Sequence, residues 1–214
     1  MFVAILLPSG NSFDEMRIDK SMIKKTVIPL YVFLLSMTAF LAPASAESYY
    51  FDDSQSAVTF EVGYLAGTCR GRFSKFEGKL DFDRENPEKS SVSIVIQVES
   101  VDTDSAKRDA HLQEDDFFYS SKFPTITFRS EGFKKRGDRL IVTGPLTIRG
   151  VSKPISLLVD LKGKQAQWVS GGDALLFESQ YELNRLDFGV GEGQPGIDER
   201  IRIKLDVKAF EAKR

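Results

Sequence analysis

The sequence predicts an all-β domain of about eight antiparallel strands with one or two short helices. Apolar and polar residues alternate with a period of two through most of the chain after residue 47, and turn-forming residues separate the alternating runs. Only residues 105–118 carry a helical pattern, with Ser105 as the candidate N-cap. Strands with a single apolar face form a two-sheet sandwich or a closed barrel. A barrel of eight strands is either just filled by its side chains or holds one small ligand, and alternation alone does not separate these outcomes.

The most regular strand lies near the end of the chain, where Ile201, Ile203 and Leu205 alternate with charged residues. Alternation of this kind gives a strand one dry face and one wet face, as in an antiparallel sheet. Earlier runs repeat the pattern, and the predicted strands are 58–62, 76–82, 92–98, 126–128, 140–148, 155–161, 175–183 and 201–209. Gly144-Pro145 interrupts one of them and predicts a bulge or an edge position there. The turn signals are Asn86-Pro87, Gly137-Asp138, Gly150 to Pro154 and Gly171-Gly172.

Residues 1–46 are predicted to be a secretory signal peptide, and residues 47–214 the folded domain. Three lysines between positions 20 and 25 precede an apolar run over 26–42, and Ala44-Ser45-Ala46 follows as a small-x-small cleavage site. The apolar run is at the short end of the roughly 17–25 residues that span a bilayer, so an uncleaved anchor is the alternative. Acidic residues before position 20 fit a leader poorly, which makes Met16 or Met22 a candidate start.

Composition argues against several classes of function. The chain of 214 residues has 29 Lys and Arg against 31 Asp and Glu, so its net charge of −2 provides no general attraction for nucleic acid. A single histidine cannot form a two-histidine zinc site, and a single cysteine cannot form an intrachain disulfide. Cys69 is therefore expected to be a small apolar packing residue. Asp102-Thr103-Asp104 opens like a calcium loop, but Ala106 occupies the next ligand position. We expect no metal and no cofactor.

Residues 191–196 match the G-x-G-x-x-G pattern of dinucleotide-binding folds. That chemistry needs a strand before the glycines and a helix after them, because the helix N-terminus meets the pyrophosphate. Here Pro195 lies inside the motif and an alternating strand follows it. We interpret the segment as a glycine-rich loop at the mouth of a barrel.

Two polar clusters are the remaining candidates for chemistry. Arg108, Asp109 and His111 lie together beside Leu112. They form either a hydrogen-bonded cluster that ties the helix to the barrel or a polar latch near a ligand head group. Because His111 is the one side chain that ordinarily titrates near neutral pH, a hydrolase acting on a lipid-like substrate is an alternative. The second cluster follows a strand end and consists of Asn184, Arg185 and Asp187.

The ordered set of motifs in residues 49–209 resembles the YceI-like family of secreted, lipocalin-like, polyisoprenoid-binding proteins. The motifs are Ser56-x-Val58-x-Phe60, Gly71-Arg72-Phe73-x-x-Phe76-x-Gly78-x-Leu80, Ser90-Ser91-Val92, Asp102-Thr103, Arg108-Asp109-x-His111-Leu112, Asp116-Phe117-Phe118, Phe123-Pro124, Thr143-Gly144-x-Leu146-Thr147-Ile148-Arg149-Gly150-Val151-x-Lys153-Pro154 and Asn184-Arg185-x-Asp187-Phe188-Gly189. Each motif is weak by itself, whereas their order is specific. Tyr64-Leu65 departs from the His-Leu of many members, so no role passes to a histidine at that position.

The resemblance implies an eight-stranded antiparallel lipocalin-like barrel that holds an isoprenoid or similar apolar tail in the bacterial periplasm and is not an enzyme. The bound lipid would be a ligand, and transient membrane contact and a homodimer are further expectations. An envelope stress protein with a filled core is the remaining alternative. The inward members of the strands are the predicted tail contacts: Phe60, Val62, Phe76, Leu80, Ile94, Ile96, Val98, Phe128, Phe177, Tyr181, Ile203 and Leu205. The predicted head-group contacts are Arg108, His111, Asn184 and Arg185, because arginines suit a pyrophosphate and amides suit a quinone.

Overall fold

The computed structural model describes residues 46–166 and 173–212. The predicted signal peptide lies outside the described residues apart from Ala46, and so does the turn signal Gly171-Gly172. The strand segments are β1 (Glu47–Asp52), β2 (Ala57–Tyr64), β3 (Gly67–Phe73), β4 (Phe76–Phe82), β5 (Ser91–Gln97), β6 (Val101–Asp102), β7 (Thr125–Arg129), β8 (Gly132–Arg136), β9 (Arg139–Ile148), β10 (Val151–Ala166), β11 (Asp173–Asn184) and β12 (Ile197–Glu211). The helical elements are α2 (Ala106–Leu112) and the 3-10 turns η1 (Pro87–Lys89), η2 (Val98–Ser100) and η3 (Arg185–Phe188).

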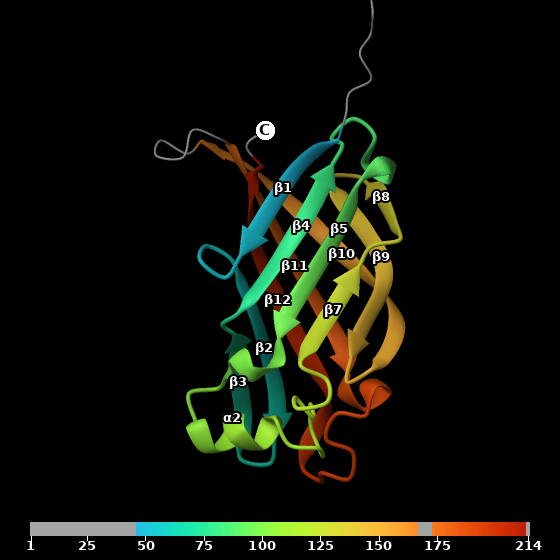
Figure 1. Cartoon of the computed structure of the whole chain (residues 1–214). Helices are drawn as coiled ribbons and strands as arrows, with labels where there is room; N and C mark the ends of the chain where they lie inside the picture. The colour runs from blue at the N-terminus through green and yellow to red at the C-terminus, as the bar shows by residue number, and fades with distance from the viewer. Residues whose placement is uncertain (1–45, 167–172, 213–214) are drawn as a thin grey trace, which may run out of the picture. The chain divides into compact units, whose positions relative to one another are not determined.

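These segments form a closed antiparallel barrel of eight strands within the described residues, which confirms the predicted fold (Figure 1). The first four strands are each interrupted once, so that β1 continues into β2, β3 into β4, β5 into β6, and β7 into β8. Strand β12 shows this clearly, because it pairs with β2 between Ile197 and Asp206 and with β1 at Phe210 and Glu211. The pairing of β12 with β1 closes the ring, so the interior is reached only through the ends.

Each predicted strand corresponds to one strand of the barrel, but the interruptions were not predicted. The segments β1, β3, β6 and β8 are the halves of interrupted strands that were not among the predicted strands. Gly144-Pro145 lies in β9 between the residues that pair with β7 and those that pair with β8. A side chain at Gly144 would place its Cβ 2.1 Å from the backbone oxygen of Arg129, so the chains approach too closely there for any other residue.

Some of the least exposed residues lie where β1, β11 and β12 meet. Leu175 and Ala209, which are opposite each other in the register of β11 and β12, are fully buried, and Tyr49 of β1 is nearly so. Each Å² of apolar area removed from water stabilises the fold by roughly 25 cal/mol. The buried side chains at this end of the barrel therefore form a hydrophobic core that stabilises the fold. The opposite end carries α2, the β2–β3 turn and η3 (Figure 1).

The helix α2 covers only part of the predicted window, and no helix among the described residues is long and apolar enough to cross a membrane. Ser105 occupies the N-cap position, as expected, but its side chain makes no capping hydrogen bond. The carboxylate of Asp109 accepts hydrogen bonds instead from the backbone N–H of Thr103 (2.9 Å) and its hydroxyl (2.5 Å). These contacts fix the entry of the chain into the helix.

Candidate functional site

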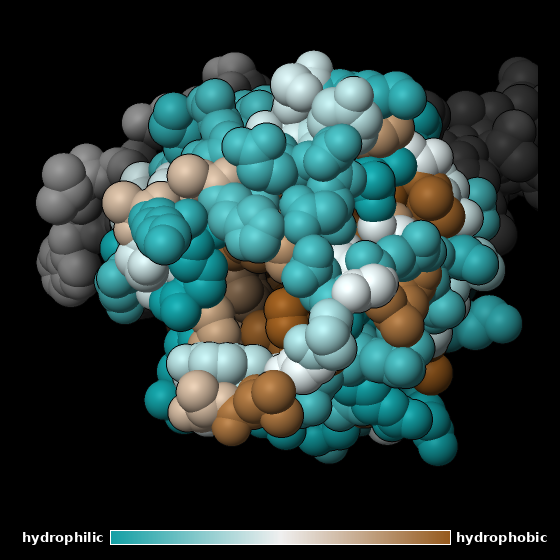
Figure 2. Space-filling model, turned by 90° about the horizontal axis from the view of Figure 1, so that it is seen from below, coloured by the Kyte–Doolittle hydropathy of each residue, from teal (hydrophilic) through white to brown (hydrophobic). Residues whose placement is uncertain are grey.

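The barrel contains a cavity of about 330 Å³ that opens at the end carrying α2. Seen from below, apolar side chains lie inside a hollow that mostly hydrophilic residues surround (Figure 2). The walls come from β2, β3, β5, β7 and β9 to β12, and their inward side chains are almost all aliphatic or aromatic. Pockets for small ligands range from about 300 to 1,000 Å³. The interior is therefore hollow at this end, and the filled-core alternative does not describe it.

Eight of the twelve predicted tail contacts line this cavity. They are Phe60, Val62, Ile94, Ile96, Phe128, Tyr181, Ile203 and Leu205. Leu80 and Phe177 line a second cavity of about 70 Å³. Phe76 and Val98 line neither of these two cavities and are packed in the core. Both lie beside an interruption of a strand: Phe76 is the first residue of β4 and pairs with Ile96, and Val98 begins η2.

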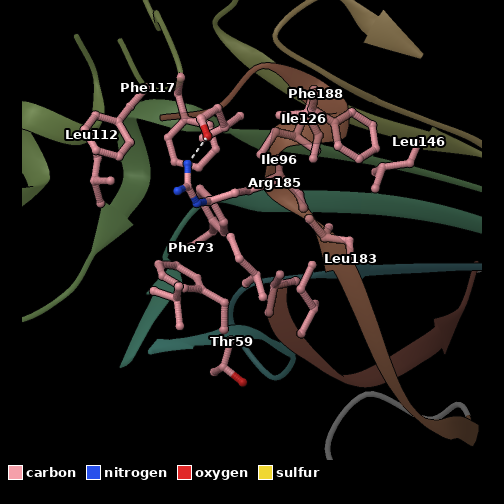
Figure 3. Close-up of a pocket in the computed structure, with 18 of the residues that line it drawn as sticks. Thr59, Phe73, Ile96, Leu112, Phe117, Ile126, Leu146, Leu183, Arg185 and Phe188 are labelled. Atoms are coloured by element: carbon pink, nitrogen blue, oxygen red, sulfur yellow. Dashed lines mark hydrogen bonds between the residues drawn. The ribbon is translucent and has the colours of Figure 1, made fainter. Parts of the chain in front are cut away.

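Arg185 is the most buried charged group at the mouth, with only 5% of its surface exposed. Its guanidinium donates to the backbone oxygens of Val190 (2.7 Å), Gly191 (2.5 Å), Ile197 (3.1 Å) and Asp198 (3.0 Å). Four of its five N–H groups are used in this way, which leaves one on Nη2. Figure 3 shows the side chain among the aromatic and aliphatic residues of the cavity. Arg185 therefore both shapes the mouth and places a positive charge beside the lumen.

The glycine-rich segment lies at the mouth, as predicted, because Arg185 holds it there. Gly191 has a φ of 66°, in the left-handed region that favours glycine. A Cβ at this position would lie 2.7 Å from Nη1 of Arg185, so any larger residue would push the guanidinium away. Gln194 of this segment and Val190, which directly precedes it, line the cavity. Neither was predicted as a contact, since only the folded chain brings this loop over the lumen.

Asn184 does not line the cavity, unlike the other three predicted head-group residues. Its side-chain oxygen accepts a hydrogen bond from the backbone N–H of Leu186 (2.9 Å) and so caps η3, and its amide donates to Glu199 (3.3 Å). The amide predicted to meet a ligand is thus engaged in holding the turn that carries Arg185. We leave Asn184 out of the candidate site.

Arg108 and His111 line the mouth from α2. Arg108 donates through Nε to the hydroxyl of Thr103 (2.8 Å) and through Nη2 to its backbone oxygen (2.6 Å). No hydrogen bond joins its Nη1 to another group of the described residues. Of the three guanidinium nitrogens of Arg108, Nη1 is therefore the one whose N–H groups can donate to a ligand at the mouth.

His111 links α2 to the glycine-rich loop through Asp116. Its Nε2 lies 3.1 Å from Oδ2 of Asp116, and the same oxygen accepts from Nε2 of Gln194 at 2.8 Å. The imidazole also packs edge-on against Phe117, with ring centres 4.9 Å apart. This arrangement is consistent with both hypotheses for the cluster: that it holds the helix to the barrel, and that it contacts a ligand head group at the mouth. Its acidic partner is Asp116 rather than the neighbouring Asp109, which is bonded to Thr103.

The chain matches a known protein family over most of its length. The model of the YceI-like domain matches residues 49–209, which is most of the sequence. The chain belongs to the YceI-like family. A UPF0312 protein of Pseudomonas aeruginosa is 34% identical over 191 residues, which cover 88% of this chain and 99% of the relative.

Solved structures share the fold of this YceI-like barrel. BcnA of Burkholderia cenocepacia superimposes with a TM-score of 0.68 at 23% identity, over 74% of this chain and 98% of BcnA. A domain of Saccharophagus degradans, described as polyisoprenoid-binding and implicated in plant cell wall breakdown, gives a TM-score of 0.57 at 16% identity. That match covers 77% of this chain and 98% of the domain.

Cys69 of the YceI-like barrel is buried in the cavity wall, in keeping with the predicted packing role. Burial raises the pKa of its thiol, and the nearby Arg108 only partly opposes this. The thiol is therefore protonated at neutral pH and is a poor nucleophile. No hydrogen bond connects it with His111 in the described part of the chain.

Proposed function

We propose that this YceI-like barrel binds an amphiphilic lipid, with a prenyl or similar apolar tail in the lumen and the head group at the mouth, and carries or stores it in the periplasm. The observation that carries the proposal is the apolar cavity of about 330 Å³, open at one end. A prenyl tail has no hydrogen-bonding groups, and the cavity wall likewise has few polar side chains. The polyisoprenoid-binding description of the Saccharophagus degradans neighbour supports the same ligand class. Family and fold together favour binding over catalysis.

Selectivity in such a site must come from the length of the lumen and from the head group. Each buried methylene gains about 0.8 kcal/mol relative to water, but a bilayer offers the tail nearly the same gain. Transfer of the tail alone from bilayer to barrel is close to neutral. The ligand is thus distinguished by where its tail ends and by what its head group meets.

The polar groups of the mouth suit an anionic or carbonyl-bearing head group. Nη1 of Arg108 and the remaining N–H of Arg185 are cationic donors, and His111 lies on the same rim. Tyr181, predicted to contact the tail, adds a hydroxyl on the cavity wall. Burial, and then the charge of Asp187, raise the pKa of this hydroxyl, so at neutral pH it remains a donor. Charge-assisted hydrogen bonds from such donors are about twice as strong as neutral ones.

The direct test is to identify what the protein carries. Purified from a host that makes prenyl lipids and extracted with organic solvent, it should yield close to one prenyl lipid per barrel by mass spectrometry. A lipid-free extract from protein that is folded and was never exposed to detergent would count decisively against the proposal.

Leu65 suggests how a lipid would enter from a membrane. It is 93% exposed in the turn between β2 and β3, and its backbone N–H donates to Gly196 (2.9 Å), which places it beside the glycine-rich loop. Its neighbour Tyr64 lines the cavity and is also exposed. Large apolar side chains in water at an open mouth are typical of a surface that meets lipid. We propose that this turn makes the transient membrane contact, whereas dimerisation stays a prediction.

Replacing Leu65 with Ser should slow transfer of a fluorescent prenyl alcohol from phosphatidylcholine vesicles by about tenfold, because burial of a leucine gains roughly 1.5–3 kcal/mol. The transfer rate of the unaltered protein should rise in proportion to vesicle concentration, as collisional transfer requires. Tyr50→Ser is the matched control, since Tyr50 is exposed on β1 and does not line the cavity. Equal rates for both variants would show that the turn does not touch the bilayer.

A further inference from the structure

Four side chains divide the lumen into two compartments. Ile94, Phe128, Leu157 and Leu205 line both the main cavity of about 330 Å³ and the second cavity of about 70 Å³. They come from β5, β7, β10 and β12, so they project inward from strands around the ring. We name these four residues the neck. Beyond it the second cavity is also apolar, with Phe51, Leu80 and Phe133 in its wall.

We propose that the neck sets the upper limit on the length of the tail that this barrel accepts. The inference rests on the proposed lipid-binding function and narrows its substrate class to amphiphiles with a short prenyl tail that ends at the neck. Both compartments are apolar, so nothing in their chemistry prevents a tail from passing between them. Only the volume of the neck side chains separates them.

Phe128 is the largest member of the neck and the most effective barrier. It is 5% exposed, and in the strand register it lies opposite Ile94 on β5 and Leu146 on β9. Close-packed side chains of this kind do not yield without strain, because protein interiors have the packing density of organic crystals. The main cavity lies at the lower end of the size range of ligand pockets, which agrees with a short tail.

Phe82 provides a matched control for Phe128. It has the same 5% exposure and lines neither of the two cavities. Its ring packs edge-on against Phe177, a wall residue of the second cavity, with centroids 5.8 Å apart. Phe82→Ala therefore removes the same atoms from the far side of the neck and leaves the neck intact. Phe128→Ala removes them from the neck and joins the two compartments.

The test measures affinity for a graded series of prenyl alcohols: geraniol, farnesol, geranylgeraniol and geranylfarnesol. Each competes with N-phenyl-1-naphthylamine, whose fluorescence reports occupancy of the apolar lumen. For the unaltered protein, affinity should rise by about fourfold per additional buried methylene until the tail reaches the neck, and then stop rising. With Phe128→Ala, the rise should continue to the next longer alcohol, with a gain of at least about tenfold. Phe82→Ala should keep the original limit.

Phe128→Leu provides a milder second variant should the alanine variant not fold, and it should move the limit in the same direction by a smaller amount. Circular dichroism establishes which variants are folded. The neck is refuted if affinity of the unaltered protein rises through the whole series, or if a folded Phe128 variant keeps the limit shown by Phe82→Ala. Either result leaves lipid binding intact, whereas failure of every alcohol to displace the probe would overturn the proposed function itself.

Discussion

Replacing Ile203 with Trp should weaken lipid binding by at least about tenfold while the barrel stays folded. Ile203 projects from β12 into the main cavity and is only half-buried there, because one side of it faces empty space. An indole at this position would occupy the space that the tail needs. Overpacking a filled core destabilises by roughly 1–3 kcal/mol, and a hollow lumen should tolerate the added volume at the lower end of that range. Displacement of N-phenyl-1-naphthylamine measures the loss, and thermal unfolding measures the stability.

The adjacent Lys204 supplies the control, since it is exposed on the outer face of the same strand. Lys204→Trp adds the same side chain to the outside of the barrel and should bind lipid normally. If both tryptophan variants bind as the unaltered protein does, the ligand does not occupy this cavity.

Arg185→Met should destabilise the protein by roughly 3–5 kcal/mol and disorder the mouth. The guanidinium donates to four backbone oxygens, two of Val190 and Gly191 where the glycine-rich loop begins and two of Ile197 and Asp198 at the start of β12. Removing it leaves buried carbonyls without donors, each of which costs about 1–3 kcal/mol unless water reaches it. Urea unfolding should therefore show a large loss of stability. Hydrogen exchange should show loss of protection concentrated in residues 189–198.

Two other variants separate this effect from loss of charge. Arg185→Lys keeps the charge, but an ammonium has three donors and cannot reproduce the planar fork, so it should recover only part of the stability. Arg200→Met removes an exposed arginine that pairs with Glu182 at 3.0 Å on the barrel surface. Such pairs contribute about 0–1 kcal/mol, so its stability should hardly change. An Arg185→Met protein as stable as Arg200→Met would contradict the structural role.

The alternation of residues was sufficient to predict the number of strands and the class of fold. In a strand with one polar and one apolar face, such as 201–209, the sequence alone shows which side chains face the interior, because successive side chains point to opposite faces. The same local rule placed Ile203 and Leu205 on the inner side, where the structure has them. It also placed Phe76 and Val98 in the interior, where both are buried, but it could not show that they lie outside the two cavities.

The polar part of the site was only partly predictable. Arg108, His111 and Arg185 were identified by residue type and position, and all three line the mouth. Asn184 was equally plausible by type, yet its side chain is bonded to Leu186 and Glu199. The hydrogen bond from Gln194 to Asp116 joins residues 78 apart in the sequence, which no local pattern connects. Asp116 is only five residues from His111, but residue type and spacing pointed to Asp109 as its neighbour.

The sequence alone determined that this chain folds as an antiparallel β domain with one apolar face, because that information is carried by neighbouring residues. Whether the apolar face encloses a hollow or a filled interior depended on side chains from different strands meeting across the ring. Only the tertiary structure decided this, along with the neck and the buried position of Arg185. The physical reason is that volume and hydrogen-bond partners are properties of the assembled barrel, while periodicity belongs to each strand separately.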